Sequence, residues 1–281
     1  MSTSERPVII VTGASRGIGL SIVEHLLGQV QSPKISPSRV LTLSRSLPQP
    51  LSDLQKRYPD DLECLQGDVT TEDTNKTLVN TAISKWGRLD GVVLNAGLLS
   101  VGRVADLAPS EFSKQVTTNL SSLFTSLHFM LPELRKSPVG LGRVVLVSSG
   151  AAVGNYAAWG AYNASKAGLN ALARTVANEE NGKVAVWAVR PGVVNTEMIQ
   201  MIVNDGTKLG MDESAITKFK GLYQEGKLLR PEQPGHVMAA LVTNGTLEEP
   251  KTKEGKGAGA LGEYISFDEP QLKEFWAGEQ P

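Results

Sequence analysis

Tyr162 and Lys166 have the residue types and the spacing of a proton-transfer pair. They lie four residues apart in a segment, 157–178, that has a helical pattern, so both side chains should share one helix face with Cβ atoms about 5 to 6 Å apart. A free phenol has a pKa of about 10, too high for easy proton exchange at neutral pH, but a neighbouring ammonium favours the phenolate. The pair therefore suits acid–base chemistry. The alternative is an exposed pair on an amphipathic helix.

Ser149 could supply a hydrogen bond to the same chemistry. It follows the apolar run 144–147 in the sequence Ser148-Ser149-Gly150. A hydroxyl at the end of a strand can donate to a carbonyl oxygen on which negative charge develops. Taken alone, such a sequence is more often a turn. Together with Tyr162 and Lys166, it predicts a site for carbonyl chemistry.

The segment TGASRGIG, from Thr12 to Gly19, has the features of a phosphate-binding turn. It stands between a strand-like run, 8–11, and a helical pattern, with glycines spaced as Gly-x-x-x-Gly-x-Gly. Glycines let the backbone approach a pyrophosphate, and a helix start offers it N–H groups. The alternative is a plain tight turn. The residues expected to bind a dinucleotide here are Gly13, Ser15, Arg16, Gly17, Ile18 and Gly19.

The second apolar run ends in Ser44-Arg45-Ser46, which bears on the choice of dinucleotide. Folds that prefer NAD place a carboxylate there, on the ribose 2′-hydroxyl. This chain has no acidic residue at that place, and Arg45 offers a planar, always charged group suited to a 2′-phosphate. Arg16 can reach the same phosphate. Ser44 and Arg45 therefore predict NADPH/NADP as the cofactor, unless Arg45 is simply a solvated surface residue.

Apolar runs followed by polar or glycine turns repeat along the chain. They are residues 8–11, 40–43, 62–65, 91–94, 144–147, 184–189 and 263–267. Helical stretches, notably 110–136 and 157–178, separate them. The pattern predicts an α/β fold, a Rossmann-type, doubly wound, mostly parallel seven-stranded sheet flanked by helices. Ligands of such sheets bind beyond the carboxyl ends of the strands, so the polar turns should converge on one cleft.

The length of 281 residues fits one large domain, which we predict to span residues 1–281. Residues 195–230 contain methionine, glycine and a mixed-charge helical pattern without strand signals, and they are predicted to form a substrate lid. Residues 248–262, EEPKTKEGKGAGALG, are predicted to form a flexible loop because they are rich in glycine and lysine.

Composition argues against several classes of partner. The 28 basic and 29 acidic side chains give a net charge of −1, so nucleic acid is not an expected partner. Cys64 is the sole cysteine and His25, His128 and His236 are scattered, which argues against a metal site. There is no signal-peptide pattern and no apolar run of roughly the 20 residues that a bilayer span needs. We expect a cytoplasmic protein with no membrane partner.

Six stretches of the chain carry a family resemblance. They are Thr12 to Gly19; Asp68-Val69; Asn95-Ala96-Gly97; Asn119; Ser149 with Tyr162-x-x-x-Lys166; and Pro191-Gly192 with Val194 and Thr196. In this order and at this spacing they resemble the short-chain dehydrogenase/reductase family over the whole length. Residues 191–198, 222–229 and 263–268 are more narrowly similar to its fungal benzil reductase and sepiapterin reductase-like branch.

The resemblance implies a role for each stretch. Asp68 and Val69 would meet the adenine, while Asn95, Ala96, Gly97, Pro191, Gly192, Val194 and Thr196 would contact the rest of the cofactor. Ser149 would orient the carbonyl and Tyr162 would donate the proton; Ser149 is favoured over Ser148 because it precedes Tyr162 by 13 residues. Lys166 would bind ribose and lower the pKa of Tyr162. Asn119 would bend its helix and hold a water beside Lys166.

The predicted function is NADPH-dependent reduction of a small ketone or 1,2-dicarbonyl compound to an alcohol. Alternatives are a sepiapterin-type or secondary-metabolite ketoreductase, the reverse oxidation, and a non-enzymatic NADP-binding regulatory protein. The resemblance also implies a homodimer or homotetramer formed through the helices that hold Asn119 and Tyr162. Tyr156 and Trp159 are candidates for the pocket wall, with burial in the core as the alternative.

Overall fold

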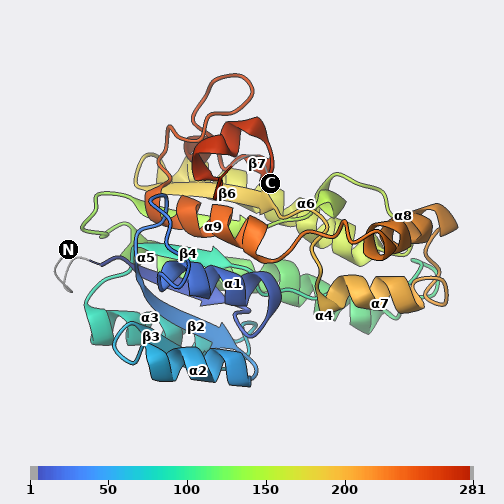
Figure 1. Cartoon of the computed structure of the whole chain (residues 1–281), viewed down its shortest axis with the longest axis horizontal. Helices are drawn as coiled ribbons and strands as arrows, with labels where there is room; N and C mark the ends of the chain where they lie inside the picture. The colour runs from blue at the N-terminus through green and yellow to red at the C-terminus, as the bar shows by residue number, and fades with distance from the viewer. Residues whose placement is uncertain (1–5, 279–281) are drawn as a thin grey trace.

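Seven parallel strands form the sheet at the centre of the fold (Figure 1). The computed structural model of the chain describes residues 6–278. The strands are β1 (Val8–Thr12), β2 (Arg39–Ser44), β3 (Leu62–Gln66), β4 (Gly91–Leu94), β5 (Gly142–Val147), β6 (Val184–Arg190) and β7 (Tyr264–Ser266). Their order is β3-β2-β1-β4-β5-β6-β7, and every neighbouring pair is parallel. The predicted doubly wound fold is confirmed, and strand order reverses between β1 and β4.

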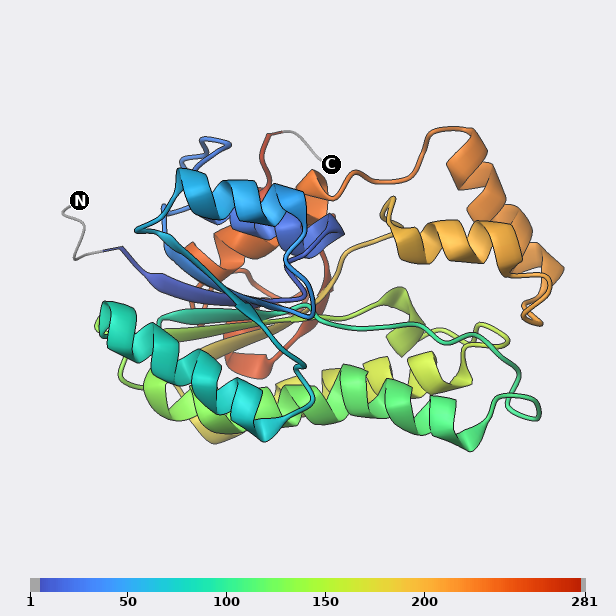
Figure 2. The ribbon, with the colours of Figure 1, turned by 90° about the horizontal axis from the view of Figure 1, so that it is seen from below.

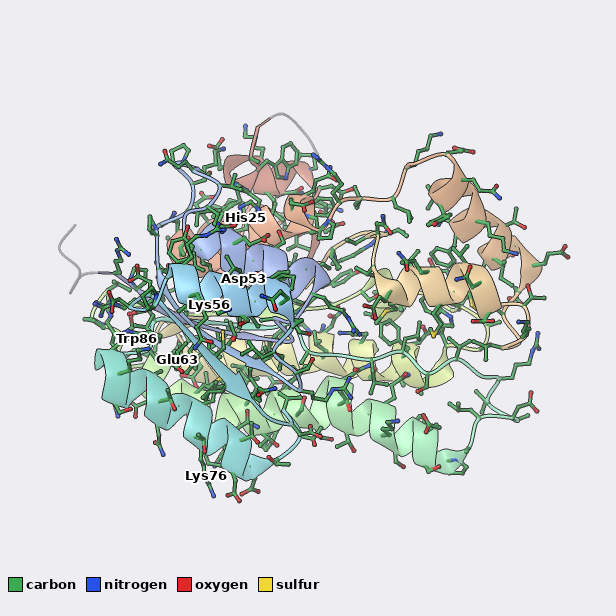
Figure 3. All side chains as sticks on the ribbon, turned by 60° about the horizontal axis from the view of Figure 1, so that its bottom comes forward. His25, Asp53, Lys56, Glu63, Lys76 and Trp86 are labelled. Atoms are coloured by element: carbon green, nitrogen blue, oxygen red, sulfur yellow. The ribbon has the colours of Figure 1, made fainter. Side chains whose placement is uncertain are left out.

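Helices cover both faces of this sheet (Figure 2). One face carries α1 (Gly17–Leu26), α2 (Gln49–Arg57) and α9 (Glu232–Asn244); the other carries α3 (Glu72–Trp86), α5 (Ser122–Leu134) and α6 (Gly160–Glu180). All five residues of β1 are buried, as expected of a strand covered on both sides. Helix α2 buries Leu51 and Leu54, whereas Asp53 and Lys56 lie on its outer face and pair at 3.5 Å (Figure 3).

The helix predicted over residues 110–136 is divided in three. It consists of α4 (Pro109–Val116), a π-helical turn at Thr117–Ser121, and α5. Asn119 lies buried in the π turn, and its carboxamide is held by the backbone of Leu98: Oδ1 accepts from the Leu98 N–H at 2.8 Å and Nδ2 donates to the Leu98 carbonyl at 2.8 Å. A π turn interrupts the regular helical hydrogen bonding and often marks a functional site.

Residues 195–230 form two helices beyond the carboxyl end of the sheet. These are α7 (Glu197–Asp205) and α8 (Glu213–Gln224), which pack on each other and project from the body of the molecule (Figure 2). The two ends of the segment are joined by hydrogen bonds, because Asn195 N–H donates to the Leu229 carbonyl at 2.8 Å and Leu229 N–H donates to the Val193 carbonyl at 3.0 Å. The two ends of the segment, which leads from β6 to α9, thus lie side by side.

The segment 248–262 differs from the predicted flexible loop. Its tip, residues 253–256, is exposed, whereas Gly257, Ala258 and Gly259 are buried, and Ala258–Leu261 forms the short helix α10 against β6. A Cβ atom on Gly259 would lie 2.8 Å from the Trp187 ring and 2.4 Å from the Thr246 carbonyl oxygen. In residues 257–259 the small residues serve close packing, which composition does not distinguish from flexibility.

Two short helical pieces complete the described chain: the 3₁₀ turns at Gly150–Ala152 and Pro270–Phe275. Between residues 6 and 278, no helix combines the length and the apolar character needed to cross a bilayer.

We expect Gly259→Ala to lower the Tm by several degrees, because the added methyl group has no room beside Thr246 and Trp187. Gly221→Ala in α8 is the matched control: no heavy atom lies within 4 Å of its added Cβ, and alanine favours a helix over glycine by about 1 kcal/mol. Thermal unfolding of both variants measures the difference. If Gly259→Ala were as stable as Gly221→Ala, α10 would not be packed as described.

Candidate active site

A cleft of about 850 Å³ lies beyond the carboxyl ends of the strands. The predicted cofactor residues that line it are Gly13, Ser15, Arg16, Gly17, Ile18, Ser44, Arg45, Asp68, Val69, Asn95, Ala96, Gly97, Tyr162, Lys166, Pro191, Gly192, Val194 and Thr196. Ser149 lines the same cleft. Gly19 and Asn119 do not line the cleft but contact residues that do, Gly13 and Gly97 respectively. Parallel strands thus bring together residues from both halves of the chain at the point where strand order reverses.

The glycine turn between β1 and α1 is shaped as a cradle. Gly13 and Gly17 have φ values of +68° and +55°, which favour glycine. A Cβ atom on Gly19 would lie 2.2 Å from the Gly13 carbonyl oxygen, so this position also requires glycine. Helix α1 starts at Gly17 without a side-chain cap, which leaves its first N–H groups facing the cleft region. These features fit the pyrophosphate of a dinucleotide.

Asn95 joins this cradle to the end of β4. Its Nδ2 donates to the carbonyl oxygens of Thr12 at 3.1 Å and Gly13 at 3.0 Å. In return, the Thr12 hydroxyl accepts from the N–H groups of Asn95 and Ala96, both at 3.1 Å. The cradle is therefore held by side chains as well as by the sheet.

Two arginines lie near the predicted ribose site: Arg45, which follows β2, and Arg16, in the glycine turn after β1. Arg45 is exposed, and among residues 6–278 it makes no ion pair. Arg16 pairs with Glu197 of α7 at 3.0 Å, and both side chains are largely exposed. Asp68 accepts hydrogen bonds from the N–H and hydroxyl of Thr70, which hold the pKa of its carboxyl below the ordinary value. The cleft therefore has two cations near this end, of which only Arg16 is paired.

Tyr162 stands in the first turn of α6, and its phenol lies next to Ser149 in the cleft. Burial raises the pKa of Tyr162 to about 12, and the neighbouring Ser149 side chain only partly opposes this effect. The sequence predicts that Lys166, together with an oxidised nicotinamide ring, favours the phenolate. In the structure, loss of water around the phenol is the largest influence on its pKa. Tyr162 is thus a neutral phenol at physiological pH.

Lys166 lies one helical turn further along α6. Its Nζ donates to the Val147 carbonyl at 2.7 Å and stands 5.7 Å from the centre of the Tyr162 ring. Burial lowers the pKa of Lys166 to about 8. The ammonium form therefore predominates at neutral pH but is easily lost above it.

Asn119 lies next to Lys166 and links the neighbouring elements by hydrogen bonds. Besides its bonds to Leu98, its Nδ2 donates to the Ser165 hydroxyl at 3.2 Å, which links the π turn to α6 next to Lys166. A Cβ atom on Gly97 would lie 3.2 Å from Asn119 Oδ1 and 3.8 Å from Lys166 Nζ. Both Nδ2 hydrogens of Asn119 are thus engaged, one with the Leu98 carbonyl and one with the Ser165 hydroxyl. Asn119 therefore holds the backbone at Leu98 and helix α6 in place. The water expected between Asn119 and Lys166 stays a prediction.

An aromatic wall, defined as Tyr156, Trp159 and Phe219, lines the other side of the cleft. Trp159 and Phe219 stack with ring centres 5.9 Å apart and planes 13° apart, and Tyr156 lies 4.9 Å from Trp159. Trp159 also donates to Met211 Sδ at 3.4 Å. Tyr156 and Trp159 were sequence candidates. Phe219 was missed, although its spacing from Ile216 marked the buried face of α8.

Comparison with known proteins agrees with this geometry. A model of the short chain dehydrogenase family matches residues 7–206. The chain is 36% identical to benzil reductase ((S)-benzoin forming) of Saccharomyces cerevisiae over 272 residues, 94% of this chain and 97% of that protein. It is 38% identical to an uncharacterized oxidoreductase of Schizosaccharomyces pombe, over 87% of this chain and 94% of the relative. A crystal structure of a short chain dehydrogenase/reductase from Saccharomyces cerevisiae superposes with a TM-score of 0.83 at 35% identity, covering 96% of this chain and 99% of that one.

The buried ammonium of Lys166 should cost stability in a pH-dependent way. Its pKa is about 8 in the folded protein against an ordinary value of 10.5, so the unfolded chain binds the extra proton between these two pH values. The cost is therefore fully present below pH 8 and disappears as the pH rises toward 10.5. We expect Lys166→Met to have a higher Tm than the parent at pH 7, with the difference shrinking between pH 8 and pH 10.

Thermal unfolding across this pH range measures the effect. Lys85→Met, which removes an exposed lysine that pairs with Glu63, is the control and should show no such gain at pH 7. A constant difference between Lys166→Met and the parent at every pH would contradict the assignment of a depressed pKa to Lys166.

Proposed function

Because the chain belongs to the short chain dehydrogenase family and is an oxidoreductase of carbonyl or hydroxyl groups, we propose that it is an NADPH-dependent carbonyl reductase. Its substrate would be a small ketone or 1,2-dicarbonyl compound, which it reduces to an alcohol. The observation that carries the proposal is the grouping of Ser149, Tyr162 and Lys166 in the same cleft as the glycine cradle.

Different groups of residues along the cleft suit different parts of the cofactor. The cradle of Gly13, Gly17 and Gly19 would hold the pyrophosphate, and Asp68 and Val69 would stand at the adenine. The nicotinamide half would lie along the remaining wall, formed by Asn95, Ala96, Gly97, Pro191, Gly192, Val194 and Thr196. When bound, NADPH supplies the hydride.

The chain's own groups supply the rest of the reaction. The Ser149 hydroxyl donates a hydrogen bond to the substrate carbonyl oxygen and stabilises the negative charge that develops there. Tyr162, held neutral by burial, gives its Oη proton to that oxygen, so the carbonyl becomes a hydroxyl and the tyrosine a phenolate. The nearby Lys166 ammonium stabilises this phenolate until a proton returns from solvent. A neutral phenol beside a cation is thus suited to the reductive direction.

The aromatic wall supports a preference for flat, apolar carbonyl compounds. Tyr156, Trp159 and Phe219 present ring faces and edges next to Tyr162, with Trp159 5.7 Å from the Tyr162 ring centre. Benzil, the substrate named for the yeast relative, is a 1,2-diketone flanked by two aromatic rings. We therefore place aryl 1,2-diketones first among candidate substrates. A sepiapterin-type or other ketoreductase remains the alternative within the enzyme class, whereas a non-enzymatic role would not call for all three reactive side chains.

Two further expectations are retained as proposals. Residues 195–230 would act as a lid, because Phe219 and Met211 of this segment contact Trp159 in the cleft. A second copy of the chain would meet the helices that hold Asn119 and Tyr162. An apolar face on these helices supports this proposal: Phe124 of α5 is 64% exposed and stands beside Leu120 and Leu172.

Tyr162→Phe keeps the ring but removes the proton donor, so turnover should fall by roughly two or more orders of magnitude while NADPH affinity changes little. NADPH oxidation with benzil, an aliphatic diketone, a pterin-like ketone, a quinone and an aldehyde measures both the activity and its preference. Tyr58→Phe, at the end of α2 and outside the residues that line the cleft, is the control. Near-normal turnover of Tyr162→Phe with the best substrate would overturn the mechanism.

Arg45→Ala should weaken NADPH binding by about 1.5 to 3 kcal/mol, the range of a hydrogen bond to a charged group, and leave NADH almost unaffected. The KM values for both dinucleotides report this difference. Arg57→Ala removes another exposed arginine that lies outside the cleft and should change neither value. An equal loss for both dinucleotides in Arg45→Ala, or a parent enzyme that prefers NADH, would contradict NADPH selection by Arg45.

A further inference from the structure

The backbone of Ser149 is held by a tyrosine from the far end of the chain. Tyr264, the first residue of β7, donates its hydroxyl to the Ser149 carbonyl oxygen at 3.1 Å, across 115 positions of sequence. Strand β7 pairs with β6 through Ala188, so Tyr264 is fixed to the sheet rather than to a loop. The bond therefore connects the edge of the sheet to the residue that would face the substrate.

Arg190 acts on the Tyr264 phenol through its charge. It is the last residue of β6, and its guanidinium lowers the pKa of Tyr264, against the larger effect of burial. The guanidinium also lies over Gly150, where a Cβ atom would come within 3.1 Å of Arg190 Nε. Glycine at position 150 thus leaves room for Arg190 next to Ser149. Burial raises the pKa of Tyr264, so its hydroxyl stays protonated and can donate.

Hydrogen bonds hold Ser149 at two of its atoms. Tyr264 donates to the Ser149 carbonyl. The Ser149 carbonyl also accepts from the Ala152 N–H at 3.0 Å, and the Ser149 hydroxyl accepts from the Ala151 N–H at 3.1 Å. With both its carbonyl and its hydroxyl held, Ser149 has little freedom to move away from Tyr162.

We propose that Tyr264 is a positioning residue for Ser149, and that Arg190, which lies over Gly150, restrains the same turn. The inference rests on the proposed carbonyl reduction and extends it to the C-terminal strand, which lies beyond the residues 7–206 matched by the family model. It follows that a short strand at the edge of the sheet takes part in catalysis through Ser149. A displaced Ser149 hydroxyl would donate poorly to the carbonyl oxygen, since such stabilisation depends on donor geometry.

A double-mutant cycle tests the proposal. Tyr264→Phe, Ser149→Ala and the double variant are compared with the parent, in the full-length protein with NADPH and the best carbonyl substrate. We expect Tyr264→Phe to lower kcat by roughly three- to tenfold with an unchanged KM for NADPH. In the Ser149→Ala background, measured at high enzyme concentration, the same change should have almost no further effect, because the group it positions is gone. Arg190→Met should lower kcat in the same direction, again only when Ser149 is present.

The outcomes distinguish the positioning role of Tyr264 from the proposed carbonyl reductase activity. An unchanged kcat in Tyr264→Phe, or an equal fractional loss with and without Ser149, would overturn the positioning role while leaving the carbonyl reductase intact. Full activity of Ser149→Ala would instead remove the proposed function together with this inference. Tyr58→Phe controls for loss of a tyrosine hydroxyl. Should Tyr264→Phe unfold at assay temperature, Arg190→Met gives the same comparison without altering β7.

Discussion

The Asn95 carboxamide is the contact on which both halves of the site depend. By donating to the Thr12 and Gly13 carbonyls, it fixes the glycine turn of β1 to the end of β4, where strand order reverses. Gly19 must lack a side chain because its Cβ atom would also meet Asn95, at 2.6 Å. Two residues beyond Asn95, Gly97 lies against Asn119 and Lys166. One short segment thus sets the distance between the cofactor cradle and the reactive side chains.

Burial shapes the chemistry of the reactive pair. It raises the pKa of Tyr162 and lowers that of Lys166, so it favours the neutral form of each. The tyrosine accordingly keeps a proton to give, and the lysine holds its charge only because neutral pH lies below its depressed pKa. This arrangement is unfavourable for the folded state and would favour the proposed reaction, a conflict that is common at catalytic sites.

Sequence alone predicted the strands and the cleft, because apolar runs that end in polar turns carry both the fold and the positions of its ligands. It failed where the deciding quantity depends on distant segments. The pKa of Tyr162 depends on how many atoms surround it, and the burial of Gly259 depends on Trp187, 72 positions earlier in the numbering. Phe219 and Tyr264 were missed for the same reason: nothing near them in sequence reveals Trp159 or Ser149. Local patterns predict elements and motifs, whereas contacts between remote elements require the fold.

The hydrogen-bonded junction at Val193, Asn195 and Leu229 has a consequence for diversification. Because the intervening helices begin and end at adjacent points between β6 and α9, their length and sequence can vary without displacing β6 or the strands beside it. In the proposed reaction, substrate preference would depend on Phe219 and its neighbours and would be separable from proton transfer at Tyr162. Exchange of this one segment between related proteins would be an economical route, in evolution or in the laboratory, to new substrates on an unaltered reaction centre.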